Sequence, residues 1–446
     1  MSKNYIFTFL FAVFLIFFAP IFYFVTADLG DINRISVSTD GLEADFASSL
    51  PSISANADII AFASDATNLV EDEIDWYPQV YFHDMNTGKT LIVSKNPVGN
   101  KLDGLSTNPS ISADGRYIAY VSFATNIIDN DTNGYSDIFV YDTLTDTTSR
   151  ISVGQSGEQA VGGDSTDPAI SANGRFIAYT SEATNLYVHD DNSASDIFVY
   201  DAIDNTTTAV SVYWEDDHFQ TIPFSSYSPS ISSDGRYVAY WYFTGSYQLS
   251  TVEIRDLEIE TTKRIDIMWH GDGYTYDVPI REPFISGDGK LVAFLGHRID
   301  EYLDKIGFIE VILYDLNSDE HKLISSTYDG SFSDGDSINP TISLDNRFVV
   351  FQSGASNLVH QDENNSSDIF MYDLKFNKIS IISRNTLGVQ GNSFSEHPVV
   401  SQDGSYVVFD SYASNLVDDD ANNTSDIFRI ENVITNVSIY LPLITK

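Results

Sequence analysis

The chain has 446 residues, and its 64 acidic residues against 23 lysines and arginines give a formal net charge of −41. This charge repels phosphate backbones and anionic headgroups, so it argues against nucleic acid and peripheral membranes as partners. It favours cations, basic partners, simple solubility or a high-salt environment. Cysteine is absent, which excludes disulfides, thiolate chemistry and cysteine-based zinc sites. The hydrophobic fraction of 43% can supply a large core.

The N-terminal segment, residues 1–27, has the pattern of an export sequence. Lys3 precedes an apolar run over residues 5–25, and residues 25–27 (Val-Thr-Ala) offer small side chains for cleavage. The run is also just long enough to span a bilayer as a helix. Two interpretations stay open, a cleaved signal peptide, favoured by Pro20, or an uncleaved N-terminal anchor. Both place the remainder outside the cytoplasm, as a secreted or cell-surface protein.

From residue 34 to residue 430 the sequence repeats itself, and such a period decides the architecture. A proline opens each copy, at Pro51, Pro109, Pro168, Pro229, Pro283, Pro340 and Pro398. The second copy predicts strands at residues 110–112, 116–122, 137–142 and 150–153. Asp114 and Gly115 form the first turn, because both tolerate positive φ. The proline is expected just before the first strand, where no ladder donor is lost.

Seven four-stranded antiparallel units predict an all-β, seven-bladed propeller, because each blade must bury both faces against its neighbours. Closure of the ring needs a strand that joins first to last. Residues 34–37 (Arg-Ile-Ser-Val) reproduce residues 150–153, so we expect the N-terminal strand to complete the last blade. Residues 437–441 are the competing candidate. The short tail, residues 431–446, is either an added edge strand or a stalk.

The repeat P-x-I-S-x-D-G-R followed by S-D-I-F-V-Y-D resembles the WD-like repeat of TolB-type propellers. The resemblance covers residues 34–430 and implies a propeller used as a binding platform. No G-x-S-x-G motif of a serine hydrolase occurs in the chain.

An acidic loop between the second and third strands is the clearest chemical motif. Its oxygen side chains at positions 1, 3, 5 and 9 can wrap a hard cation, and the spacing is similar to calcium loops of integrin-type propellers. The alternative is a solvated turn in which these side chains cap backbone amides. In the third and sixth copies Val188 and His360 stand at position 1, which weakens the pattern. The predicted calcium ligands are Asp129, Asp131, Asn133 and Asp137 in the second copy, and Asp418, Asp420, Asn422 and Asp426 in the seventh.

The fourth and fifth copies lose this loop and gain aromatic residues. Rings beside carboxylates can hold a sugar or a basic side chain, although the same rings can pack their own loops. The predicted ligand-binding residues are Trp214, His218, Trp241, Tyr242, Trp269 and His270.

Support for catalysis is weak in the sequence. Six histidines (His189, His218, His270, His297, His360 and His397) are expected in long loops, but no close pair marks a metal site. We therefore expect a monomeric, non-catalytic module that binds a protein or glycan on its long-loop face. The alternative is a metal-assisted polysaccharide lyase or glycoside hydrolase on that face, as a resemblance to oligogalacturonate lyases implies.

Overall fold

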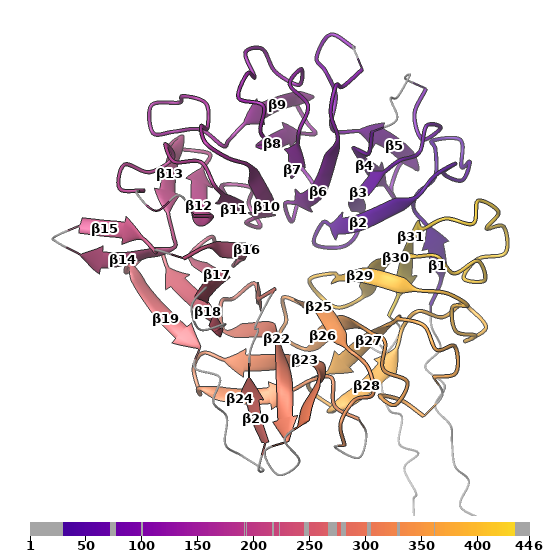
Figure 1. Ribbon diagram of the computed structural model, residues 1–446. Coiled ribbons are helices and arrows are strands. Elements are labelled where there is room, and N and C mark those ends of the chain that lie inside the picture. The colour runs from indigo at the N-terminus through magenta and orange to yellow at the C-terminus, as the bar shows by residue number, and fades with distance from the viewer. Residues whose placement is uncertain are drawn as a thin grey trace, which may run out of the picture.

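The computed structural model describes residues 30–71, 77–99, 101–190, 192, 194–215, 218–222, 224–244, 249–265, 274–277, 282–300, 305–327, 331–360 and 362–432. These residues form a ring of seven β-sheets around a central axis (Figure 1). The predicted all-β, seven-bladed propeller is confirmed. The N-terminal segment up to residue 29 and the tail from residue 433 lie outside the described residues, as does the competing closure strand.

Each blade is an antiparallel sheet whose strands follow one another from the centre outward. Blade one contains β2 (Ser48–Ile53), β3 (Ile59–Ser64), β4 (Gln79–Asp84) and β5 (Lys89–Ile92). Blade two contains β6 (Ser106–Ile111), β7 (Tyr117–Ser122), β8 (Asp137–Asp142) and β9 (Thr147–Arg150). Blade three contains β10 (Ser165–Ile170), β11 (Phe176–Ser181), β12 (Asp196–Asp201) and β13 (Thr206–Ala209). Blade four contains β16 (Ser226–Ile231), β17 (Tyr237–Thr244), β18 (Leu249–Asp256) and β19 (Thr261–Ile265), and blade five contains β20 (Tyr274–Asp277), β21 (Phe284–Ile285), β22 (Leu291–Asp300), β23 (Lys305–Asp315) and β24 (Glu320–Leu323). Blade six contains β25 (Ser337–Ile342), β26 (Phe348–Ser353), β27 (Asp368–Asp373) and β28 (Lys378–Ile381), and blade seven β29 (Ser395–Val400), β30 (Tyr406–Ser411), β31 (Asp426–Glu431) and β1 (Ile32–Arg34).

The last blade closes the ring with the N-terminal strand. β1 pairs antiparallel with β31, and Arg34 stands opposite Phe428. Arg150 of β9 stands opposite Phe139 of β8 in the same way. The predicted equivalence of residues 34–37 with 150–153 is therefore confirmed.

The turn motif that ends in arginine serves the packing between blades; it reads D-G-R in blades two and four, N-G-R in blade three and D-N-R in blade six. In four blades its arginine pairs with the aspartate that ends the third strand, at 2.6 to 2.8 Å, and lies over the aromatic ring that follows it. Gly174 has φ of +72°, and a Cβ there would approach the Tyr117 ring of the preceding blade to 2.3 Å. The glycine is therefore needed both for its positive φ and for the close contact of the blades.

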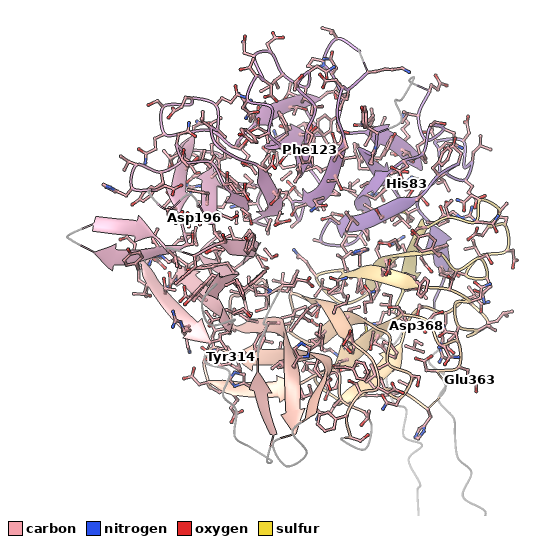
Figure 2. All side chains as sticks on the ribbon, in the orientation of Figure 1. His83, Phe123, Asp196, Tyr314, Glu363 and Asp368 are labelled. Atoms are coloured by element: carbon pink, nitrogen blue, oxygen red, sulfur yellow. The ribbon has the colours of Figure 1, made fainter. Side chains whose placement is uncertain are left out.

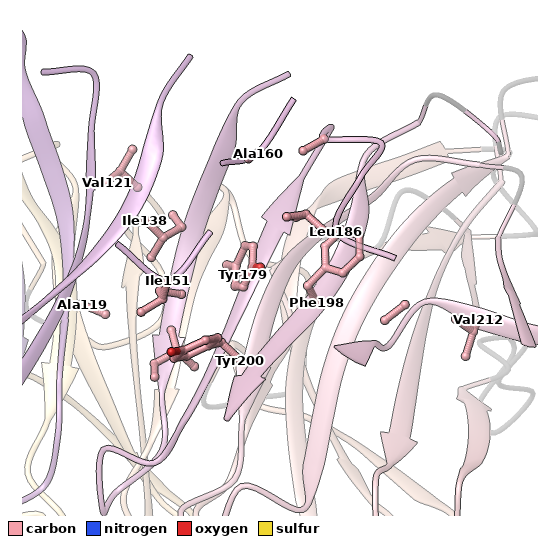
Figure 3. Close-up of a cluster of buried hydrophobic side chains, with 13 residues drawn as sticks. Ala119, Val121, Ile138, Ile151, Ala160, Tyr179, Leu186, Phe198, Tyr200 and Val212 are labelled. Atoms are coloured by element: carbon pink, nitrogen blue, oxygen red, sulfur yellow. The ribbon is translucent and has the colours of Figure 1, made fainter. Parts of the chain in front are cut away.

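The core consists of clusters formed where neighbouring blades face each other. Between blades two and three, Val121 and Ile138 of the second blade pack with Tyr179 and Phe198 of the third (Figure 3). Tyr179 and Phe198 are fully buried. Because each blade relies on the next for its core, the ring must close to bury both faces of every sheet.

The strand boundaries differ from the sequence prediction in two places. The innermost strand of the second blade begins at Ser106, so Pro109 lies inside it rather than before it. The register shifts between Thr107 and Ser110, and this β-bulge at an edge strand accommodates the proline. The fourth strand runs from Thr147 to Arg150, because the chain leaves the sheet after Arg150.

A two-stranded hairpin, β14 (Val212–Glu215) and β15 (His218–Thr221), interrupts the regular order between blades three and four. It projects outward from the ring (Figure 1). In the part of the chain that the structure describes, no helix is long and apolar enough to cross a membrane.

Candidate functional site

The aspartates at position 9 of the acidic loops, Asp137, Asp196, Asp368 and Asp426, are fully buried and are called here the four loop aspartates. Each accepts hydrogen bonds of 2.5 to 3.1 Å from a serine hydroxyl and from the asparagine at position 5 of the same loop. The serine and asparagine donors are Ser152 and Asn133, Ser211 and Asn192, Ser383 and Asn364, and Ser36 and Asn422, in that order. The loop is thus tied to the outer edge of its blade.

Burial raises the pKa of each of the four loop aspartates, although their hydrogen bonds oppose the shift. The pKa rises to about 7 for Asp196 and to about 6 for Asp368 and Asp426. Asp196 and Asp368 lie on opposite sides of the ring (Figure 2). Each blade must therefore compensate its own buried carboxylate.

In the second copy the compensating cation is a side chain. The Arg150 guanidinium lies 3.2 Å from Asp131 and 3.1 Å from Asp137, and its side chain is 10% exposed. Gln159 of the link to the next blade donates to Asp131 at 3.0 Å. Asp129, at position 1, is exposed. The sequence contained a signal for this partner, since Arg150 belongs to the repeated Arg-Ile-Ser-Val segment.

The compensating cation changes from copy to copy. In the sixth copy burial raises the pKa of Asp368 and the charge of Arg384 opposes part of that rise, while Gln390 donates to Asp362 at 3.0 Å. In the third copy Ala209 occupies the position of Arg150, opposite the central phenylalanine of its blade. Among the described residues no lysine or arginine contributes to the pKa of Asp196.

The seventh copy gathers three carboxylates. Glu43, Asp420 and Asp426 offer oxygens that all lie within 4.8 Å of one another, a group that could hold a metal ion. Asn422 binds Asp426, whereas Asp418 is exposed at the loop surface. Two predicted ligands, Asp420 and Asp426, are thus brought together with one residue, Glu43, that the spacing did not reveal.

The predicted aromatic site falls partly outside the described residues, which do not include Trp269 and His270. Trp214 and His218 belong to the projecting hairpin, where only their backbone is described. Trp241 packs on Tyr227, with ring centroids 5.1 Å apart.

Tyr242, the other predicted aromatic residue whose side chain is described, is buried within the fourth blade. Its ring stacks on Phe224 at 6.4 Å, and its hydroxyl accepts a hydrogen bond from Arg264. The described part of the site therefore has its aromatic rings in contact with their own blade.

A second candidate site lies on the axis, where the residue before each repeat proline faces a cavity of about 380 Å³. All seven of these residues have positive φ, between 48° and 55°, and six of them lie at a β-bulge of the innermost strand. We call them the channel ring: Leu50, Asn108, Asp167, Ser228, Glu282, Asn339 and His397. Non-glycine residues rarely adopt this conformation, and bulges of this kind re-aim side chains beside functional sites.

Two carboxylates and one imidazole line the channel. Asp167 and Glu282 line it, and the residues described as lining it include no lysine or arginine. His397 contacts Asp410 at 2.9 Å, and these two residues converge with Glu396 within 4.8 Å. Burial opposes a charge on His397, but the carboxylates of Asp410, Glu396 and Glu282 outweigh it, so the pKa of His397 is raised. The sequence signal for this ring was the residue before each proline.

No family model and no curated protein matches the sequence. The structure is similar to oligogalacturonate lyase from Vibrio parahaemolyticus, with 11% identity, 90% of each chain covered and a TM-score of 0.51. It is similar to the propeller domain of the Trilobed protease from Pyrococcus furiosus, with 13% identity, 86% of this chain and 95% of that chain covered and a TM-score of 0.51. TolB from Acinetobacter baumannii matches with 13% identity, 88% and 80% coverage and a TM-score of 0.40.

These likenesses show the fold. The predicted propeller fold is confirmed at that level by the oligogalacturonate lyase and the Trilobed protease propeller. The Trilobed protease propeller is described as having an open velcro topology, whereas in this chain β1 pairs with β31.

Proposed function

We propose that this chain is an exported, non-catalytic binding propeller whose ligand enters the channel. The channel ring carries the proposal, because one repeated backbone conformation presents seven side chains of six kinds to the same cavity. Asp167 and Glu282 supply the carboxylates of this wall, where burial raises the pKa of Asp167, and the net charge of −41 attracts cations from a distance. The favoured ligand is a protein segment with an exposed lysine or arginine.

A binding measurement tests this proposal directly. A trilysine peptide is titrated into the full chain, with the peptide acetylated at every lysine as the uncharged comparison. The double variant Asp167→Asn and Glu282→Gln should bind the charged peptide about tenfold or more weakly, because it removes two carboxylates from the channel.

The control removes the same charge elsewhere. Asp40 and Glu71 are exposed, and Asp40→Asn with Glu71→Gln leaves the channel unaltered. This variant should bind as the wild type does. Equal weakening in both double variants would mean that trilysine senses the overall charge and would overturn the channel proposal.

The convergence of Glu396, His397 and Asp410 favours a second candidate function, a metal-assisted polysaccharide lyase. An oligogalacturonate lyase in complex with manganese has a similar fold, with 10% identity, 91% of this chain and 90% of that chain covered and a TM-score of 0.51. Incubation with oligogalacturonate and manganese should then release unsaturated products that absorb ultraviolet light. If no such products appear and trilysine binds at the channel, the lyase is refuted and the non-catalytic binding propeller is supported.

The proposal also includes calcium in the acidic loops. The oxygen spacing of the second and seventh copies supports it, and the seventh copy is favoured because in the second copy Arg150 already lies between Asp131 and Asp137. A chelator should lower the melting temperature, and added calcium should restore it.

The glycan and aromatic-site interpretation at Trp214, His218, Trp241, Tyr242, Trp269 and His270 stays a prediction.

A further inference from the structure

The junction where the ring closes contains carboxylates from both ends of the described chain. Glu43 follows β1, whereas Asp420 and Asp426 come from the loop before β31 and from its first residue. Their oxygens converge within 4.8 Å. Glu43 also accepts the backbone amide of Ala421 at 3.1 Å, which fixes it against the loop.

The equivalent turns of two other blades show what is unusual here. Isolated bridges join Val153 to Gln159, Arg384 to Gln390, and Val37 to Glu43, so Glu43 stands where the other two turns have glutamine. Those glutamines donate hydrogen bonds of 3.0 Å to Asp131 and Asp362, the position-3 aspartates of their loops. A glutamate side chain at this position has no N–H group to donate to the aspartate.

Asp420 is the position-3 aspartate of the closing blade, and it lacks that donor. Both of its carboxylate oxygens are buried and accept no hydrogen bond from any residue that the structure describes. An unsatisfied buried carboxylate is costly, and here a second carboxylate, that of Glu43, lies beside it. Burial and the neighbouring Glu43 raise the pKa of Asp420, so either a proton shared by the two carboxyls or a bound cation satisfies both.

The resident cation does not neutralise the group. The Arg34 side chain is 8% exposed, and its Nη1 lies 2.6 Å from Glu43. Its Nε and Nη2 are buried and donate no hydrogen bond to the described residues. In the second blade one arginine faces two carboxylates, but here one arginine faces three. With Glu43, Asp420 and Asp426 ionised, and leaving aside the exposed Asp419 that lies 3.8 Å from Arg34, the remaining charge is −2, which one divalent cation would neutralise.

We propose that Glu43, Asp420 and Asp426 bind one divalent cation, with calcium the expected ion because the ligands are carboxylate oxygens. The inference rests on the calcium part of the proposed function and replaces the exposed Asp418 of the predicted set by Glu43. Since Glu43 belongs to the segment that follows β1, the ion holds the closing strand in the last blade. Its effect is therefore on the integrity of the ring.

The test compares three full-length proteins, wild type, Glu43→Gln and Asp131→Asn, by thermal unfolding in chelator and in millimolar calcium. Glu43→Gln copies the residue of the two equivalent turns, so it keeps an acceptor for the Ala421 amide. Calcium should raise the melting temperature of the wild type and of Asp131→Asn by about 3 °C. It should leave that of Glu43→Gln unchanged.

Hydrogen exchange of the Ile35 amide provides a second readout, because this amide donates to Ile427 across the closure. Calcium should slow its exchange about tenfold in the wild type and not in Glu43→Gln. The same calcium response in Glu43→Gln as in the wild type would overturn the closure site.

The outcomes separate this inference from the broader calcium proposal. A response lost in Asp131→Asn but kept in Glu43→Gln would place the ion in the second copy and refute the closure site. A wild type indifferent to both chelator and calcium, with no heat of calcium binding, would refute both proposals.

Discussion

Asp196 is a buried loop aspartate for which the described part of the chain supplies no arginine partner, and replacing it with asparagine should change how stability depends on pH. Burial raises the pKa of this carboxyl from 3.8 to about 7. The folded chain therefore holds a proton here that the unfolded chain has released, and stability falls as the pH rises between these values. At about 1.4 kcal/mol per pH unit, the whole interval corresponds to about 4 kcal/mol of unfolding free energy.

The assay is urea unfolding at about pH 5 and about pH 8. Roughly two pH units of the interval lie between these conditions, so Asp196 accounts for about 3 kcal/mol of the stability that the wild type loses. The Asp196→Asn variant has no carboxyl to ionise at this position. Between the two pH values its unfolding free energy should therefore fall by about 3 kcal/mol less than that of the wild type. The substitution also disturbs the hydrogen bond from Asn192, so the difference between the two pH values is the informative quantity.

The matched control is Asp201→Asn in the same strand. Arg175 lowers the pKa of the Asp201 carboxyl, so its stabilising charge is lost only as the pH falls through values below 3.8, outside this window. Relative to the wild type, the control should be destabilised by the same amount at about pH 5 and at about pH 8. If Asp196→Asn shows the same pH dependence as the wild type, Asp196 is not held protonated and the reasoning fails.

Three further substitutions follow from the packing and charge of the blades. Gly174→Ala should destabilise the chain by about 1 to 3 kcal/mol in urea unfolding, since it adds a Cβ at positive φ against Tyr117; an unchanged midpoint would contradict this contact. Arg150→Gln should cost about 3 kcal/mol because it leaves two buried carboxylates without their cation, and stability equal to that of the wild type would show that another ion replaces it. Ala209→Arg gives the third blade the arginine of the second, and it should lower the pKa of Asp196 and thereby flatten the loss of stability above about pH 5; an unaltered pH profile would count against the equivalence of the two positions.

The sequence was sufficient for the architecture because each blade repeats the same local rules. The Asp-Gly turn and the alternating apolar strands recur with a fixed period, and the Arg-Ile-Ser-Val segment at residues 34–37 identified the closing strand before any contact was known. The prediction that Pro109 precedes the innermost strand was wrong, because a β-bulge changes the register without changing the composition of the strand.

The candidate sites were less accessible to this reasoning. Loop spacing identified Asp420 and Asp426, yet their partner Glu43 lies more than three hundred residues away in the chain and meets them only through ring closure. The repeat pattern predicts Arg150 only as part of a strand motif, whereas its guanidinium occupies the space between two carboxylates. Long-range charge pairing of this kind depends on which blades meet, and a repeat pattern does not specify it.

The channel ring separates the shape of the protein from the chemistry of its centre. The positive φ before each proline fixes the direction of one side chain, whatever that side chain is, and the blade core is built from other positions. The seven places hold leucine, asparagine, aspartate, serine, glutamate, asparagine and histidine on nearly identical backbones. A propeller of this design can exchange one ligand for another through single substitutions on the axis, while every blade keeps its fold.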